Sequence, residues 1–150
     1  TDWELKLLIN EIIDQFEIKA KQKKIRLVYD KQSINFLVYA DKGKISQVLS
    51  NLISNSIKYG KKNGITKISC YQSKTKCWVS VKDNGIGIAE KNRKRLFERF
   101  YRVDKGRSRK VGGTGLGLAI VKHALDRNNA VIEIVSELDH GSNFTIVFEK

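Results

Sequence analysis

The sequence predicts an α+β fold: a two-layer sandwich in which helices cover one face of a mixed, mostly antiparallel sheet. Three observations lead to this prediction. Short β-type segments occur in pairs, single segments with helical spacing separate the pairs, and no linker is long enough to divide the 150 residues. Paired strands between single helices are typical of an α+β sandwich. We therefore expect one domain over residues 1–150.

The first half of the chain predicts one helix, two strands and a second helix. Apolar residues recur at helical spacing over residues 5–20. Residues 25–29 and 34–40 are short and rich in β-branched and aromatic residues, which is typical of strands. Asp41 is a suitable N-cap for a helix that runs to about Tyr59.

The second half predicts two hairpins and two helices. In chain order these are a hairpin of residues 66–72 and 77–82, a short basic helix near 89–97, a helix over 117–127 after a glycine-rich loop, and a hairpin of residues 131–136 and 143–149. Cys70 and Cys77 flank the first turn and could face each other across it. Two cysteines are too few for a metal site or a disulfide-stapled domain, so we expect reduced packing residues.

The composition indicates a basic globular domain with an anionic ligand. Lys and Arg outnumber Asp and Glu by 29 to 16, for a formal net charge of +13. Lysines are dispersed, and the densest basic segment, residues 93–109, adjoins motifs that suit a polyphosphate. We therefore expect a phosphorylated ligand and no nucleic-acid partner. The longest apolar runs are too short to span a membrane. The chain begins at Thr1 and contains no methionine, so we expect it to be part of a longer protein.

The second helix presents polar side chains beside its apolar stripe. At about 100° per residue, Asn51, Asn55 and Lys58 fall on one narrow stripe. Two amides and an ammonium suit a site for polyphosphate and metal, because Mg²⁺ takes only one or two protein oxygens and Lys attracts phosphate. The alternative is the solvated side of an amphipathic helix.

Two glycine motifs suit a nucleotide. In residues 83–88, Asp83 precedes Gly85 and Gly87, which let the backbone approach a flat ligand. A buried carboxylate accepts a hydrogen bond from the amino group of adenine, whereas guanine presents a carbonyl there. In residues 112–118, four glycines precede a helix, whose first N–H groups can bind an anion. The alternatives are a plain Asp-Asn-Gly turn and a flexible connector; neither the Walker nor the dinucleotide motif fits.

Together these segments resemble the histidine-kinase members of the Bergerat-fold ATPase superfamily. Residues 51–59 resemble the asparagine box, 83–88 the first glycine box, 96–104 the phenylalanine box and 113–118 the second glycine box. The four boxes occur in the family's order and spacing. The resemblance implies a Bergerat fold that binds ATP and Mg²⁺.

The resemblance also implies a role for each matching position. Asn55 is the expected Mg²⁺ ligand, and Lys58, Arg99 and Arg102 are the candidate catalytic residues, because they position phosphate. Asp83 is the expected acceptor for the adenine amino group. The residues expected to bind ATP are Asn51, Asn55, Lys58, Tyr59, Asp83, Gly85, Gly87, Ile88, Tyr101, Arg102, Gly113, Thr114, Gly115, Leu116, Gly117 and Leu118.

The implied activity is transfer of the γ-phosphoryl group of ATP to a histidine on a separate dimerisation segment, in two-component signalling. ATP-hydrolysing relatives such as gyrase tend to carry a glutamate base where this chain has Asn51, so efficient hydrolysis is not expected. The family's acceptor histidine is usually followed by an acidic residue, whereas His123 and His140 are followed by Ala and Gly. We therefore expect no autophosphorylation of the isolated chain.

The partners implied are the histidine-bearing dimerisation helices of a homodimeric parent kinase and a response regulator. The resemblance places this domain, as a monomer, in the cytoplasm and its parent in the bacterial membrane. Two alternatives remain open. One is a serine kinase of the same superfamily, such as an anti-sigma factor. The other is a non-catalytic basic module that binds nucleic acid or only senses nucleotide.

Overall fold

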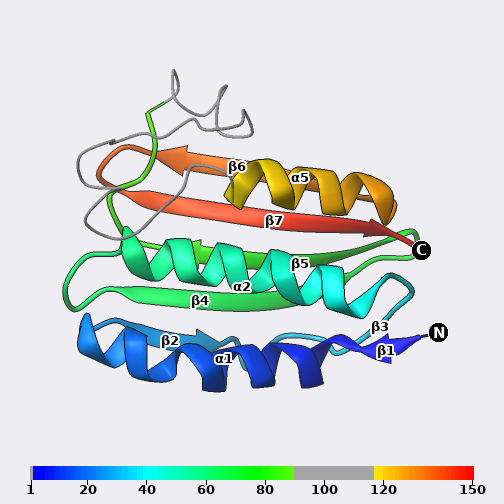
Figure 1. Cartoon of the computed structure of the whole chain (residues 1–150), viewed down its shortest axis with the longest axis horizontal. Helices are drawn as coiled ribbons and strands as arrows, with labels where there is room; N and C mark the ends of the chain where they lie inside the picture. The colour runs from blue at the N-terminus through cyan, green and yellow to red at the C-terminus, as the bar shows by residue number, and fades with distance from the viewer. Residues whose placement is uncertain (1, 90–116) are drawn as a thin grey trace.

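The computed structural model describes residues 2–89 and 117–150, which build a five-stranded sheet with three helices on it and a small two-stranded sheet (Figure 1). The strand order of the larger sheet is β2-β4-β5-β7-β6. Only β2 and β4 run parallel, and the other neighbours are antiparallel. The bounds are β2 Arg26–Tyr29, β4 Ile65–Gln72, β5 Lys76–Asp83, β6 Ala130–Glu137 and β7 Gly141–Glu149. The predicted mixed, mostly antiparallel sheet is confirmed.

Helices α1 (Leu5–Gln22), α2 (Lys42–Lys58) and α5 (Gly117–Arg127) all lie on one face of this sheet, as Figure 1 shows. The two-layer sandwich predicted from the sequence is therefore confirmed. The core lies between the layers, where alternate strand residues meet the apolar stripes of the helices. Its fully buried side chains include Ile9, Leu49, Ile68, Val79 and Ile146.

Helix α2 is the central element of the helical layer and packs against α1, α5, β4 and β5. It begins after Asp41, whose Oδ1 accepts a hydrogen bond from Lys44 N at 3.1 Å, so the predicted N-cap is confirmed. Its apolar stripe is buried, and replacing Leu49 with Ala should cost about 2–5 kcal/mol of stability. This packing fixes the rotation of α2 about its axis and therefore the direction of its polar stripe.

The prediction of a strand over residues 34–40 is wrong in its extent, and the strand that does form pairs with a segment that the sequence did not indicate. Only β3, Leu37–Val38, is a strand, and it pairs with β1, Trp3–Glu4, outside the larger sheet. This segment does not pair with β2 because β4 is the neighbour of β2. The loop after β2 is also bonded to β4, since Ile34 N donates to the carbonyl oxygen of Cys70 at 2.9 Å.

The two cysteines are buried and free, so the prediction of reduced packing residues is confirmed. They do not face each other, however, because Cys70 pairs with Val79 and Cys77 pairs with Gln72. The four residues between Gln72 and Cys77 set the register of the hairpin, and this register places the two cysteines two positions out of alignment.

Within residues 2–89 and 117–150, none of the helices combines the length and the apolar character needed to cross a membrane.

Candidate functional site

Helix α2 holds the two predicted asparagines side by side. Asn55 Nδ2 donates a hydrogen bond to Asn51 Oδ1 at 3.1 Å, and both side chains are half-buried. Residues four apart lie above one another on a helix, which explains the contact. Among the described residues, no donor occupies the other oxygen, Asn55 Oδ1. The pair therefore orients one amide oxygen away from its partner, as a metal ligand requires.

The C-terminal end of α2 is joined to the segment that follows β5. Tyr59 is the C-cap residue, and its carbonyl oxygen accepts a hydrogen bond from Ile86 N at 3.3 Å. Lys58 is half-buried, and its carbonyl oxygen accepts from Lys23 Nζ at 2.6 Å. The structure thus brings residues of the predicted asparagine and first glycine boxes into contact, although they lie far apart in the sequence.

Asp83 ends β5 at this same end of the sheet. Its Oδ1 accepts hydrogen bonds from Gly85 N at 2.9 Å and from Ser142 N at 3.3 Å. Burial raises the pKa of Asp83, and these backbone bonds together with the Ser56 hydroxyl act in the opposite direction. A carboxyl group that is desolvated yet supplied with donors is a group prepared to accept a hydrogen bond from a ligand.

The glycines of residues 83–88 are required by the packing of the protein itself. Gly85 is buried, and a Cβ there would lie 2.5 Å from the carbonyl oxygen of Tyr59. Gly87 has a positive φ of 68°, and a Cβ there would overlap the carbonyl oxygen of Glu137. The segment is therefore pressed between the end of α2 and the turn that joins β6 to β7. Ile88, half-buried, packs against the core.

The turn between β6 and β7 forms part of the site, and the sequence did not indicate it. Ser136 Oγ accepts from Ile88 N at 2.8 Å and donates to the carbonyl oxygen of Gly141 at 3.1 Å. Asp139 N donates to the carbonyl oxygen of Ile86 at 2.6 Å. These residues lie about 50 positions from the first glycine box, so only a signal of long-range pairing could have identified them.

The remaining predicted site residues are only partly described. Arg99, Tyr101, Arg102, Gly113, Thr114, Gly115 and Leu116 lie outside the described residues, as do most of the predicted helix near 89–97 and the phenylalanine box. Gly117 and Leu118 begin α5, which confirms the predicted start of that helix. Both histidines are exposed: His123 lies on α5, and His140 lies in the turn before β7.

Residues 40–150 match a model of the family described as histidine kinase-, DNA gyrase B-, and HSP90-like ATPase. The chain belongs to this family. The match runs from the residue before the N-cap of α2 to Lys150, the residue after β7, so it contains Asn51, Asn55 and Asp83. The chain is thus an ATP-binding domain of the ATPase type, and its sandwich is the Bergerat fold that the sequence predicted.

Relatives and solved structures agree with this family. The chain is 38% identical over 139 residues to the sensor-like histidine kinase SenX3 of Mycolicibacterium smegmatis, covering 93% of this chain and 36% of SenX3. It is 41% identical over 139 residues to the sensor histidine kinase WalK of Bacillus subtilis, covering 91% of this chain and 22% of WalK. It therefore spans about a third or less of the length of these relatives.

Among solved structures, the nucleotide-free catalytic domain of the histidine kinase ThkA is similar with a TM-score of 0.86 and 30% identity. That similarity covers 100% of this chain and 95% of the ThkA domain. A structure of ThkA in complex with the response regulator protein TrrA is similar with a TM-score of 0.81 and 28% identity, covering 100% of this chain and 41% of ThkA.

The described residues fit a magnesium ion that is bound mainly through a ligand's phosphates. No group of three His, Cys, Asp or Glu side chains gathers as a metal site in residues 2–89 and 117–150. Asn55 Oδ1 is the oxygen that α2 leaves available. Because Mg²⁺ keeps several waters and often takes only one or two protein ligands, a single amide oxygen is chemically sufficient.

Proposed function

We propose that this domain binds ATP with Mg²⁺ and donates the γ-phosphoryl group to a histidine on a separate helical segment of its parent kinase. The observation that carries the proposal is the environment of Asp83, a partly buried carboxyl that two backbone N–H groups orient beside the end of α2. An ionised carboxylate only accepts hydrogen bonds. It therefore suits the amino group of adenine and opposes the carbonyl group of guanine.

The residues of α2 act on the other end of the nucleotide. Asn55 holds Mg²⁺, which supplies charge neutralisation at the phosphates when it is bound. Lys58 places a positive charge against the phosphates, and Asn51 fixes the orientation of Asn55 through their hydrogen bond. Asn51 cannot take a proton from water, which favours transfer over hydrolysis. Arg99 and Arg102 remain the predicted contacts to the terminal phosphates.

The acceptor lies on another segment of the parent protein. Transfer needs the acceptor nitrogen in line with the γ-phosphorus at roughly 3–3.5 Å. His123 is exposed on α5, and His140 is held in the β6–β7 turn, where Nδ1 lies 3.1 Å from the carbonyl oxygen of Leu138. The proposed partners are a histidine-bearing dimerisation segment and a response regulator, as suggested by the named histidine kinases and the ThkA–TrrA complex.

Nucleotide-dependent unfolding temperatures test adenine recognition. A ligand that binds only the folded state raises this temperature by mass action. ATP with Mg²⁺ should raise it and GTP should not, while Asp83→Ala should remove most of the ATP effect and Asp30→Ala, at the other aspartate that follows a strand, should keep it. Equal shifts with ATP and GTP would contradict the role of Asp83.

Labelled ATP tests the transfer step. The isolated chain should acquire no acid-labile label, and labelling should appear when the histidine-bearing segment of the parent is added. Stoichiometric label on His123 or His140 in the isolated chain would overturn the proposed transfer without affecting nucleotide binding.

A further inference from the structure

Two basic segments that lie far apart in the sequence meet at one end of the molecule. Residues 19–26 run from the last turn of α1 into β2, and residues 58–62 lead from the end of α2 towards β4. Figure 1 shows both segments at the left, where α1 ends and the chain turns from α2 to β4. Neither segment contains Asp or Glu. Their basic residues, which we call the basic patch, are Lys19, Lys21, Lys23, Lys24, Arg26, Lys58, Lys61 and Lys62.

Hydrogen bonds hold the two segments of the basic patch together. Asn63 N donates to the carbonyl oxygen of Lys24 at 2.9 Å, and Lys23 Nζ donates to the carbonyl oxygen of Lys58 at 2.6 Å. Lys58 is half-buried, and the other basic residues of the patch are exposed. Folding therefore gathers on one surface positive charges that the unfolded chain keeps apart.

The described part of the protein does not neutralise these charges. Within residues 2–89 and 117–150, no ion pair involves four of the exposed side chains, Lys21, Lys24, Lys61 and Lys62. Like charges on one surface repel one another, which opposes folding. The patch is thus a positive surface that an anionic partner could neutralise.

Lys24 occupies a backbone position that glycine usually takes. Helix α1 ends in a Schellman motif, in which Ile25 N donates to the carbonyl oxygen of Ala20 at 2.8 Å and Lys24 N to that of Lys21 at 2.9 Å. The residue after the C-cap is left-handed in this motif, and Lys24 has a φ of 57°. A side chain there costs free energy that glycine would not cost. A lysine at such a position, among other positive charges, indicates a function for its charge.

The composition of the patch favours an anionic lipid surface over a nucleic acid. All its basic residues but Arg26 are lysines, which act as point charges, whereas arginine makes the paired hydrogen bonds typical of phosphate and base recognition. Ile18 on α1 is 71% exposed and adjoins Lys21, because residues three positions apart are neighbours on a helix. An apolar side chain beside lysines can enter the headgroup region of a bilayer, but gains little from a phosphate backbone.

We propose that the basic patch and Ile18 form a docking surface for a bilayer that contains anionic phospholipids. Lysines near such a surface are attracted by its negative potential, and the attraction acts within about one Debye length. The proposal goes beyond the proposed function and can hold or fail independently of it, because only Lys58 of the patch is also a predicted ATP contact.

Sedimentation with lipid vesicles tests this proposal. In about 0.1 M salt the chain should bind vesicles of equal parts phosphatidylglycerol and phosphatidylcholine, and should not bind vesicles of phosphatidylcholine alone. Raising the salt to about 0.5 M should weaken the binding at least about ten-fold, because salt screens exposed charges. No binding to the anionic vesicles, or equal binding to both kinds, would overturn the proposal.

Two variants with the same change in net charge show whether the position of the lysines matters. The patch variant carries Lys21→Gln, Lys24→Gln, Lys61→Gln and Lys62→Gln. The control variant changes four exposed lysines outside the patch, by Lys42→Gln, Lys44→Gln, Lys74→Gln and Lys122→Gln. The patch variant should bind anionic vesicles at least about a hundred-fold more weakly, and the control variant less than about five-fold more weakly. Urea titrations check that both variants fold. Similar losses in the two variants would mean that total charge determines binding, and would contradict the proposal.

Lys24→Gly separates the charge from the backbone strain. It should raise the urea concentration at which the protein unfolds, because glycine adopts a positive φ freely, and should weaken vesicle binding by about five-fold, because one charge is lost. Asn63→Gly is the matched control, since Asn63 has a φ of 64° but no charge. It should leave vesicle binding unchanged. Equal vesicle binding by Lys24→Gly and Asn63→Gly would count against the patch.

Ile18→Ser distinguishes a lipid surface from other polyanions. It keeps every charge and should weaken binding to anionic vesicles by at least about three-fold, because an apolar contact with the headgroup region is lost. Leu7→Ser is the control, because Leu7 is 57% exposed on the same side of α1 but lies one turn from Glu11. It should have no effect. If Ile18→Ser also had none, or if a DNA duplex bound as tightly as the vesicles at the same salt, the patch would be a general polyanion site and the proposal would be wrong.

Discussion

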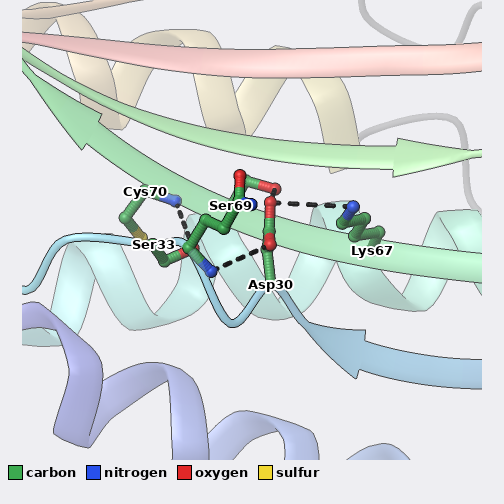
Figure 2. A network of polar contacts seen from close by, with 6 residues as sticks. Asp30, Ser33, Lys67, Ser69 and Cys70 are labelled. Atoms are coloured by element: carbon green, nitrogen blue, oxygen red, sulfur yellow. Dashed lines mark hydrogen bonds and ion pairs between the residues drawn. The ribbon is translucent and has the colours of Figure 1, made fainter.

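Two aspartates that end or follow strands of the same sheet lie in opposite environments. Asp30 follows β2, and both of its carboxyl oxygens are bonded. Oδ1 accepts from Gln32 N at 3.1 Å. Oδ2 lies 3.2 Å from Ser69 Oγ and 3.6 Å from Lys67 Nζ (Figure 2). These contacts, led by the backbone N–H of Gln32, lower the pKa of Asp30. Asp83 ends β5, and burial raises its pKa.

The difference separates a carboxyl group that stabilises the fold from one that is costly to bury. Asp30 lies in a turn in which Ser33 Oγ accepts a hydrogen bond from Cys70 N at 3.0 Å (Figure 2). Asp83 is desolvated, and among the described residues no cation contributes to its pKa. Residues kept despite such a cost are candidates for function, whereas a complete surface network is explained by structure alone.

The largest expected effect comes from disturbing the turn behind Asp83. Gly141 has a φ of 110°, and a Cβ there would overlap the backbone carbonyl of Asp83. Gly141→Ala should therefore lower the free energy of unfolding by more than about 3 kcal/mol in a urea titration. Gly43→Ala is the control, because its Cβ would lie 3.3 Å from Asp41 Oδ1 in the first turn of α2. It should change stability by less than about 1 kcal/mol, and similar losses in both variants would refute this account.

Removing the charge of Asp83 should increase stability while it removes ATP binding. The folded-state pKa of Asp83 lies above its ordinary value of 3.8, so the unfolded chain loses this proton first as the pH rises. The resulting loss of stability starts near pH 3.8 and is complete above the raised pKa. At pH 7 without nucleotide, the free energy of unfolding of Asp83→Asn should therefore be higher than that of the wild type. The difference should be on the order of 1 kcal/mol, since solvent screens part of the charge. Lower stability of Asp83→Asn at pH 7 would contradict the sign.

The charge of Asp30 should stabilise the folded protein, in contrast to that of Asp83, and its effect on stability should be smaller. Its folded-state pKa lies below 3.8, so its stabilisation is present above pH 3.8 and is lost as the pH falls through the lowered value. In thermal scans, Asp30→Asn should unfold at a slightly lower temperature than the wild type at pH 7, and this difference should shrink as the pH falls through the lowered pKa of Asp30. If Asp30→Asn lost as much stability at acid pH as at pH 7, packing and not charge would explain the effect of Asp30.

The smallest effect concerns the thiol beside the Asp30 network, because it changes reactivity and not stability. Burial raises the pKa of Cys70 to about 12, and burial also raises the pKa of Cys77. Cys70 should therefore react with iodoacetamide at pH 8 at least about a hundred-fold more slowly in the folded protein than in urea, and Cys77 should also react more slowly in the folded protein. Mass spectrometry of peptides labelled over time would show this, and rapid labelling of Cys70 in the native protein would disprove its burial.

The sequence by itself determined those elements that depend on residues close together along the chain. The spacing of apolar residues placed α1 and α2, Asp41 marked the start of α2, and the glycine motif located Asp83 at the end of a strand. The same periodicity put Asn51 and Asn55 on one stripe, where the structure joins them by a hydrogen bond. Each of these depends on residues within about one helical turn or one strand of each other.

Only the tertiary structure decided which distant groups meet. Ser142 donates to Asp83 across 59 positions, and Thr66 contacts Ser56 from another element, so neither these contacts nor the direction of the Asp83 pKa shift could be predicted from local spacing. Likewise β3 pairs with β1 because β4 already lies beside β2. Desolvation and strand pairing depend on the whole packed layer, whereas helical periodicity and capping depend on neighbours along the chain.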